Sequence, residues 1–321
     1  MVPVSPSDST RPKRRARILR IAAASVVLLA IAGYVAAQYV TSRPGPAQCT
    51  VRAAGSGSEG GYAIKPEQAA NAATIAAVAS QRELPERAVT IALATAMQES
   101  TLRNIAHGDR DSLGLFQQRP SQGWGSEEQI SDPVYSSGKF YDHLVRIPGY
   151  SRLPLTVAAQ RVQRSGFPQA YAKHEANASL LTAALTGRRA AAFTCTTGPG
   201  GPDGTTGSAE RVRERLVREF GDDVLSAQGR PTSTAARGVS LRESDADSEL
   251  RVPARAGRHG WELAHWAMAN SAELHIARIS YRNRVWDAAS SEEGWRTREG
   301  GSGGSPGTGD ASVTVRLATG Q

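Results

Sequence analysis

Residues 21–40 form an unbroken run of twenty residues without a formal charge, and this run limits what the chain can fold into. A helix of that length spans about 30 Å, at about 1.5 Å per residue, which matches the hydrocarbon core of a bilayer. Residues 1–20 form a basic tail with six cations and one acid, Asp8. Because positive charge marks the cytoplasmic end of a membrane helix, we expect a single-pass cell-membrane protein. Its N-terminus would be cytoplasmic and its bulk extracytoplasmic.

A cleavable signal peptide is the alternative interpretation of the apolar run. Residues 35–37, Val-Ala-Ala, weakly resemble a cleavage site. The run is long for the apolar core of a signal peptide, which favours a retained transmembrane helix. A solute transporter is excluded, since one membrane span cannot enclose a path.

Most of the net charge belongs to the tail. The chain carries a net charge of +8, of which residues 1–20 supply +5. A nucleic-acid surface would need a basic patch within a folded domain, so we expect no nucleic-acid partner. The six histidines show no metal-ligand spacing, and the H-E-x-x-H arrangement is absent around Glu262 and His265. We therefore expect no metal and no other cofactor.

Beyond the apolar run, composition divides the chain into four parts. Residues 41–61 form a spacer that ends in a Gly-Ser-rich stretch, and residues 62–195 form a domain with a helical pattern. Residues 196–250 begin as a Gly-Pro linker and contain a helix near 208–221, which has a narrow apolar stripe. Such a stripe indicates a docking helix or a short coiled-coil contact. Residues 251–321 form a small α+β domain.

The expected elements make the protein mainly α. In the first domain we expect helices over 65–82, 85–99, 127–130, 132–144, 155–163 and 168–186. In the last domain we expect a helix over 257–274, strands over 276–281, 285–288 and 311–317, and a flexible loop over 300–309. Four of the five tryptophans lie in or beside this last domain, and we expect them to form its core. A protein partner, if there is one, would bind through this domain.

The two cysteines, Cys49 and Cys195, both lie beyond the apolar run. An exported chain is in an oxidising compartment, where disulfides form and persist. The two residues bracket the first domain, so we predict a disulfide that joins its ends. The alternative is two unrelated thiols.

Glu99 is the most unusual charged residue of the first domain. It ends the predicted helix 85–99, and residues 88–98 carry no charge that pairs with it. Burial and the negative end of the helix dipole both raise the pKa of a carboxyl group. A glutamate that stays protonated near neutral pH suits a general acid. A solvated helix end, or a pair with Arg103, is the alternative reading.

Three motifs surround this glutamate: Glu99-Ser100, then Gly114-Leu-Phe-Gln117, then Asp132-Pro133 with Tyr141 and Leu144. Their order and spacing resemble the lytic transglycosylases of the lysozyme superfamily. The resemblance covers residues 62–195, about two fifths of the chain, and it implies a lysozyme-like α-helical domain. The excess of Arg and Ala is typical of a high-GC genome, so the chain is similar to membrane-anchored proteins of high-GC Gram-positive (actinobacterial) bacteria.

The resemblance implies a role for each motif residue. Glu99 matches a single acid/base that cleaves the bond between N-acetylmuramic acid and N-acetylglucosamine in peptidoglycan glycan strands, closing a 1,6-anhydro ring. Two-carboxylate glycosidases differ in this respect. Ser100 matches a residue that supports the site by hydrogen bonding, and Gln117 matches a groove glutamine. Gly114 would let the backbone approach sugar, and Tyr171 matches a later groove tyrosine.

The chain departs from the family at residues 162–165, Val-Gln-Arg-Ser, where an Ala-Tyr-Asn element is usual. One alternative is therefore a non-catalytic peptidoglycan-binding protein, or a secretion or conjugation assembly protein, with the same fold. A second alternative is a hydrolytic muramidase, in which Asp109 or Asp111 faces Glu99; a capped turn is the more ordinary role for these two residues. Trp124 either stacks on a sugar or wedges its loop against the core.

Overall fold

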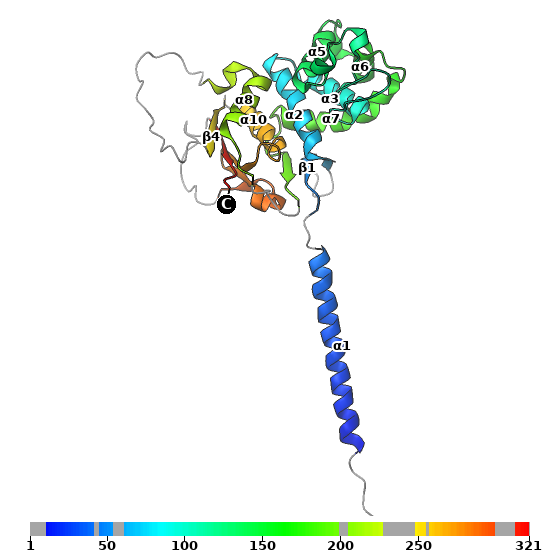
Figure 1. Cartoon of the computed structure of the whole chain (residues 1–321), viewed down its shortest axis with the longest axis vertical. Helices are drawn as coiled ribbons and strands as arrows, with labels where there is room; N and C mark the ends of the chain where they lie inside the picture. Colours follow the sequence, from blue (N-terminus) through cyan, green and yellow to red (C-terminus); the bar gives the residue numbers. More distant parts are fainter. Residues whose placement is uncertain are drawn as a thin grey trace, which may run out of the picture. The chain divides into compact units, whose positions relative to one another are not determined.

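The computed structural model describes residues 11–41, 45–53, 61–198, 205–226, 248–254, 257–298 and 312–320. The protein is mainly α, with an N-terminal apolar helix and a small antiparallel sheet near the C-terminus, as the sequence predicts (Figure 1). Two compact units are present, Met1–Gly45 and Pro46–Gln321. The predicted flexible loop 300–309, most of the linker between 199 and 247, and the start of the basic tail lie outside the described residues.

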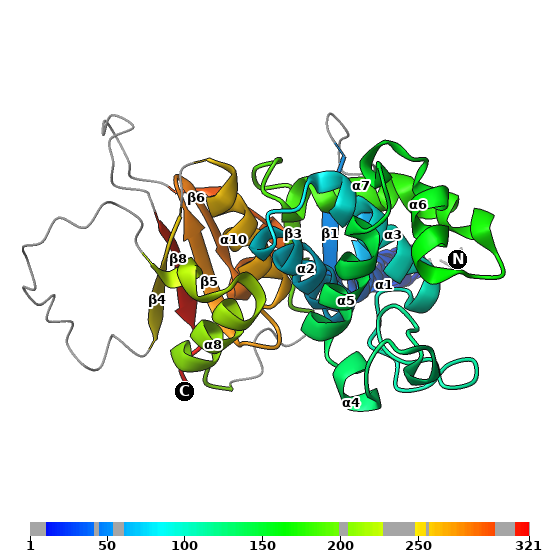
Figure 2. The same cartoon turned by 90° about the horizontal axis from the view of Figure 1, so that it is seen from above.

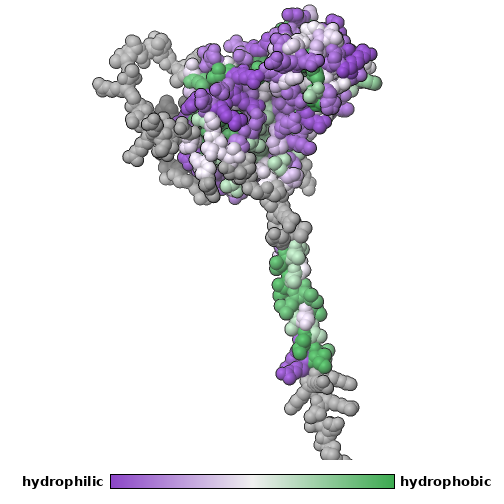
Figure 3. All heavy atoms as spheres, viewed as in Figure 1, coloured by the Kyte–Doolittle hydropathy of each residue, from purple (hydrophilic) through white to green (hydrophobic). Residues whose placement is uncertain are grey.

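The first unit contains one long helix, α1 (Arg11–Thr41). Its segment Arg17–Gln38 is long and apolar enough to cross a membrane. The apolar side chains of this segment are exposed, and Figure 3 shows them as a continuous hydrophobic surface along the helix. A soluble helix would bury such side chains, so α1 has the properties of a membrane span. A signal sequence near the N-terminus has the same properties.

The second unit is built around α3 (Glu86–Ser100), which carries the glutamate at its C-terminal end. The other long helices that pack on α3 are α2 (Pro66–Gln81), α5 (Pro133–Val145), α6 (Leu155–Gln163) and α7 (Glu175–Leu185). Small residues on α3, such as Ala88, Ala92 and Ala96, are fully buried and allow these neighbours to approach closely. Helix α3 thus lies among α2, α5, α6 and α7, and its residues 88–98 carry no charge (Figure 2).

Local sequence sets the ends of these helices. Pro66 occupies the first turn of α2, where its missing N–H is not needed. Asp132 caps α5 by accepting a hydrogen bond from the backbone N–H of Val134 (2.9 Å). The predicted helix 168–186 is divided into a 3-10 helix, η3 (Pro168–His174), and α7. The short α4 (Glu127–Ile130) has the predicted bounds.

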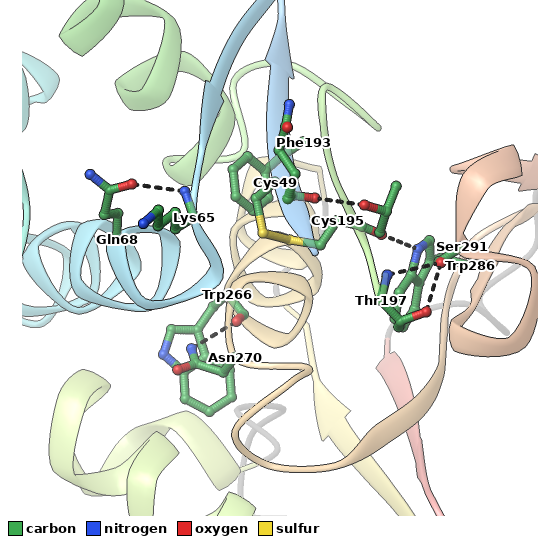
Figure 4. Close-up of a disulfide and its surroundings, with 12 residues drawn as sticks. Cys49, Lys65, Gln68, Phe193, Cys195, Thr197, Trp266, Asn270, Trp286 and Ser291 are labelled. Atoms are coloured by element: carbon green, nitrogen blue, oxygen red, sulfur yellow. Dashed lines mark hydrogen bonds between the residues drawn. A yellow bond between two sulfur atoms is a disulfide. The ribbon is translucent and has the colours of Figure 1, made fainter. Parts of the chain in front are cut away.

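A three-stranded antiparallel sheet, which the sequence did not predict, closes the base of this helical domain. Its order is β2 (Gly61–Ile64), β1 (Gln48–Arg52), β3 (Phe193–Thr196). The predicted spacer 41–61 therefore contains a structural strand. Cys49 and Cys195 are register partners on β1 and β3, and the predicted disulfide between them is confirmed (Figure 4).

The C-terminal part combines α8 (Ala209–Phe220), α10 (Arg258–Ala269) and a five-stranded antiparallel sheet. The sheet order is β4 (Glu249–Pro253), β8 (Ser312–Leu317), β5 (Ile276–Tyr281), β6 (Arg284–Asp287) and β7 (Arg296–Thr297). The predicted helix near 208–221 is α8; Ser208 accepts a hydrogen bond from the backbone N–H of Arg211 (3.3 Å) and so caps it. Strand β4 was not predicted.

Helix α10 lies between this sheet and the helical domain, and it packs against both (Figure 2). Its contacts are with β5 and β8 on one side, and with α2, α7 and β3 on the other. Trp261, Trp266 and Trp286 are buried and Trp295 is partly buried, so the predicted core role of the four tryptophans is confirmed.

Polar bonds also join the two parts. Glu219, on α8, is only 2% exposed, and its carboxylate accepts hydrogen bonds from Thr74 of α2 (3.0 Å) and Trp266 of α10 (2.7 Å). The carboxylate also pairs with Arg215 (2.9 Å). Near the disulfide, Trp286 donates to the carbonyl of Cys195 (3.1 Å) (Figure 4). The buried Thr74 and Trp266 and the half-buried Arg215 come from three helices, so this carboxylate fixes how α2, α8 and α10 meet.

Candidate functional site

Glu99 lies on the last turn of α3, one residue before the helix ends. Thr101 follows with a left-handed backbone (φ 54°), which stops the helix. The Glu99 side chain is half-buried, and this burial raises the pKa of its carboxyl group; hydrogen bonds with Tyr171 and Gln163 oppose the rise. Glu99 has no ion pair within the described part of the chain. Arg103, the residue considered above as a possible ion-pair partner of Glu99, donates from Nε to the hydroxyl of Thr101 (3.3 Å). Burial thus favours the protonated form of Glu99, while the two hydrogen bonds favour its ionised form.

Tyr171 reaches Glu99 from η3, 72 residues away in the chain. Its hydroxyl donates a hydrogen bond to Glu99 Oε1 at 2.7 Å, and its side chain is fully buried. Burial, followed by the nearby Glu99 charge and this hydrogen bond, raises the pKa of Tyr171, so the phenol keeps its proton. Tyr171 is therefore a fixed donor to the carboxylate, and its buried ring is a positioning element more than an open groove surface.

Ser100 follows Glu99 but points elsewhere. Its side chain is 4% exposed, and its hydroxyl lies 2.7 Å from the carbonyl of Leu115 and 3.0 Å from that of Ala96. The first contact joins the end of α3 to the loop that contains the Gly-Leu-Phe-Gln motif. Ser100 therefore fixes this loop against the end of α3, and its role in a reaction stays a prediction. Its buried hydroxyl is occupied by protein carbonyls.

Gly114 is required by the fold of this loop. Its φ is +73°, and a Cβ at this position would lie 2.6 Å from the carbonyl oxygen of Ile130. A side chain is therefore excluded by the protein itself, before any sugar is considered. The amide of Gly114 donates to the carbonyl of Ile105 (2.8 Å), which closes the turn.

Gln117 turns back onto its own loop. Its Nε2 donates to the carbonyl of Gly114 (3.2 Å), and its Oε1 occupies the space where a Cβ on Gly108 would lie. Among the hydrogen bonds of the described residues, none joins Gln117 to Glu99. The structure therefore brings Tyr171 onto the glutamate and leaves Gln117 and Gly114 as parts of the neighbouring loop.

Gln163 is a site residue that the sequence reasoning did not select. It ends α6, its Nε2 donates to the carbonyl of Phe116 (2.7 Å), and a hydrogen bond to Glu99 lowers the pKa of the carboxyl group. Its Oε1 is buried without a partner in the described structure. The segment 162–165 lacks the usual Tyr and Asn, but it still supplies an amide beside the glutamate. The amide chemistry shared by Asn and Gln was the signal that could have identified it.

Asp111 is bonded within its own loop, so it is not a free second carboxylate of the kind that a hydrolase would use. Asp111 Oδ1 pairs with Arg119 Nε (2.7 Å), and Oδ2 accepts from the backbone N–H of Ser121 (2.8 Å). These bonds, those of Ser121 foremost, hold the pKa of Asp111 well below its usual range. Both oxygens are thus used within the loop, in keeping with the turn role.

Trp124 wedges its loop against the core. It is 8% exposed, and its ring lies 4.2 Å from the His143 ring on α5 (centroid to centroid).

Phe167, by contrast, is 79% exposed, in the segment between α6 and η3 that leads to Tyr171. An exposed aromatic ring of this size is suited to stacking on a sugar face. Phe167 precedes Tyr171 by four residues in the chain, and the sequence reasoning did not select it. Within the described ranges, no cluster of three His, Cys, Asp or Glu residues suits a metal ion.

Comparison with known proteins gives one family. Residues 202–307 match the family model described as VldE, C-terminal domain. The match covers about a third of the chain and includes α8, α10 and most of the five-stranded sheet. No curated protein matches the chain. Glu99, Tyr171 and Gln163 all lie outside the matched residues.

Proposed function

We propose that the protein is a membrane-anchored peptidoglycan lytic transglycosylase with Glu99 as its single acid/base. The observation that carries the proposal is the buried Tyr171 hydroxyl, which donates to Oε1 (2.7 Å) of a half-buried carboxyl group whose pKa burial raises. The motifs around Glu99 support the same assignment. The apolar helix α1 supports retention at the membrane, with the second unit outside the cell.

The proposed reaction uses one carboxyl group twice. Protonated Glu99 gives its proton to the glycosidic oxygen between N-acetylmuramic acid and N-acetylglucosamine. The bond between that oxygen and C1 of the N-acetylmuramic acid then breaks. The resulting carboxylate accepts the proton of the C6 hydroxyl, whose oxygen then bonds to C1. No water is consumed, and the product is a 1,6-anhydro sugar. Tyr171 and Gln163 stabilise the carboxylate between the two proton transfers by hydrogen bonding.

The bonds of Asp111 argue against its use as the second carboxylate of a hydrolase, and Asp109 stays the other candidate for that role. A retaining hydrolase needs a second free carboxylate about 5 Å from the acid, and Asp111 is held by Arg119 and Ser121. Phe167 is proposed as an exposed ring for sugar stacking, because Trp124 is buried.

Product analysis tests the proposal. Full-length protein in nonionic detergent would be incubated with purified peptidoglycan, and the soluble fragments identified by mass spectrometry. We expect anhydro-muropeptides, and a loss of about 10²-fold or more in their release by Glu99→Gln, the range for removing a general acid. Glu210→Gln, at an exposed position on α8, is the matched control and should retain activity.

The other outcomes separate the alternatives. Reducing ends formed with water would identify a hydrolase. Equal and negligible release by wild type and Glu99→Gln, with retained binding to cell walls, would identify a binding or assembly protein.

A further inference from the structure

The outer face of the C-terminal sheet is rich in arginine. Along each strand, apolar residues such as Val252, Ile279 and Val315 face α10 and are buried, as expected for the inner face of a two-layer unit. The alternate residues face the other way and line a hollow of about 940 Å³. Six arginines line it: Arg251, Arg278, Arg282, Arg296, Arg298 and Arg316.

One row of this face, across four strands, consists only of charged residues. In register order it is Glu249 on β4, Arg316 on β8, Arg278 on β5 and Asp287 on β6. Arg316 pairs with Glu249 and Arg278 pairs with Asp287, both at 3.1 Å. The two arginines are direct neighbours on adjacent strands, and each of these carboxylates offsets part of the repulsion between them.

The next row places cations at its two ends and hydroxyl groups between them. It begins with Arg251 on β4 and continues through Thr314, Ser280 and Val285 to Arg296 on β7. No carboxylate belongs to this row. The hollow is therefore floored by hydroxyl groups and flanked by guanidinium groups.

The arginines have more donor capacity than the protein uses. Among the described residues, two carboxylates, Glu249 and Glu293, line the hollow with the six guanidinium groups, and a third, Asp287, pairs with Arg278 and Arg296. Neither Arg282 nor Arg298 has an ion pair in the part of the chain that the structure describes; Arg282 lies over the Tyr281 ring (5.5 Å). The Nε of Arg296 is buried and has no hydrogen-bond partner there. Each guanidinium carries five N–H donors, so many remain for an external anion.

We propose that this hollow binds a phosphodiester-linked polyol, an anionic polymer with phosphate groups and free hydroxyls. The guanidinium fork matches phosphate oxygens in a bidentate manner, and the hydroxyls of Ser280 and Thr314 match those of a polyol. An ordinary protein partner is disfavoured because a protein interface needs an apolar centre, and only Val285 and Tyr281 offer apolar surface here. This inference goes beyond the proposed function, because none of these residues takes part at Glu99.

The test is a binding measurement with a fluorescein-labelled poly(glycerol phosphate) oligomer. Full-length protein in nonionic detergent would be titrated by fluorescence anisotropy at 150 mM salt. We expect the double variant Arg282→Gln/Arg298→Gln to bind about tenfold more weakly, because it loses two charge-assisted contacts. These arginines have no described ion pair, so the variant leaves no carboxylate unpaired, and an unchanged Tm would verify its fold.

Two controls separate the hollow from other cations and from Glu99. Arg211→Gln/Arg213→Gln removes the same charge from exposed positions on α8 and should bind like wild type. Glu99→Gln should also bind like wild type, even if it abolishes wall cleavage. Arg251→Gln, at a side chain that is 74% exposed, is a second variant expected to weaken binding.

Three results would overturn the proposal. The first is equal binding by wild type and the Arg282/Arg298 variant. The second is an equal loss in the α8 control, which would show general attraction to a basic protein. The third is tighter binding of duplex DNA or of poly-γ-glutamate than of the glycerol phosphate oligomer, which would assign the hollow to nucleic acid or to an acidic protein.

Discussion

The disulfide between Cys49 and Cys195 closes a loop with a sequence separation of 146 residues, and that loop contains the whole helical domain. In the chain-entropy model the stabilisation grows as 1.5R times the logarithm of loop length, plus a constant. For this loop the model gives about 5 kcal/mol at 25 °C. The perturbation is removal of the cross-link, either by reduction or by Cys49→Ala/Cys195→Ala.

The two ways of removing the cross-link differ in a useful manner. Both sulfurs are buried, so alanine also leaves a void, and the double variant should lose about 1–2 kcal/mol more than the reduced wild type. Reduction keeps both sulfur atoms in the protein as thiols, so it removes the loop closure without the void that alanine leaves. Comparison of the two therefore separates chain entropy from packing.

The assay is urea unfolding with and without a phosphine reductant, and tryptophan fluorescence reports the unfolded fraction. We expect the reduced protein to unfold with a free energy up to about 5 kcal/mol smaller than that of the oxidised protein. A difference below about 1 kcal/mol would refute the reasoning. It would mean that the denatured chain already holds β1 near β3, so that the cross-link removes little freedom.

Two further predictions concern buried hydrogen bonds to carboxyl groups. Tyr171→Phe removes a donor that favours ionised Glu99, so the pKa of Glu99 rises further and the alkaline limb of the pH–activity profile moves to higher pH. A profile of kcat/KM against pH on peptidoglycan measures this, and a limb that moves to lower pH would contradict it. Glu219→Gln should lower the free energy of unfolding by about 1–3 kcal/mol, because an amide then stands among three donors that the carboxylate satisfied, while Arg215 keeps its pair with Glu273. Thermal or urea unfolding measures that loss. The control is Arg213→Gln, at an exposed position on the same helix, which should change the free energy of unfolding by less than about 0.5 kcal/mol. A similar change in both variants would contradict the prediction.

The sequence was sufficient to predict the elements in which apolar residues recur at regular spacing over many residues. The helices around Glu99 and the strands near the C-terminus carry many apolar residues at regular spacing, and their bounds agree with the structure within a few residues. Strand β1 was missed because it buries only Cys49 and Val51, and two alternating positions do not make a pattern. Strand β2 begins with a glycine, and β4 follows a long polar stretch. Short strands of this kind are defined by the partners that they find in the folded chain.

The candidate site was predictable only where its residues are local. Glu99 was identifiable because it lacks charged neighbours in sequence, and Ser100 follows directly. Tyr171 and Gln163 approach it from elements 72 and 64 residues away, and no local pattern reports such a contact. Gln163 was overlooked because a glutamine at the end of a helix is ordinary until the partner is known.

Helix α10 has one side in the core of the sheet and the other in the core of the helical domain. A helix shared in this way leaves neither core complete without it. A gene fragment that stopped after β3 would lack α10, and the apolar surfaces of α2 and α7 that α10 covers would be exposed to solvent. Such a fragment would not encode a domain that folds on its own. The glutamate and the arginine face are therefore inherited together. Recombination that exchanged one of them would have to supply a replacement for α10.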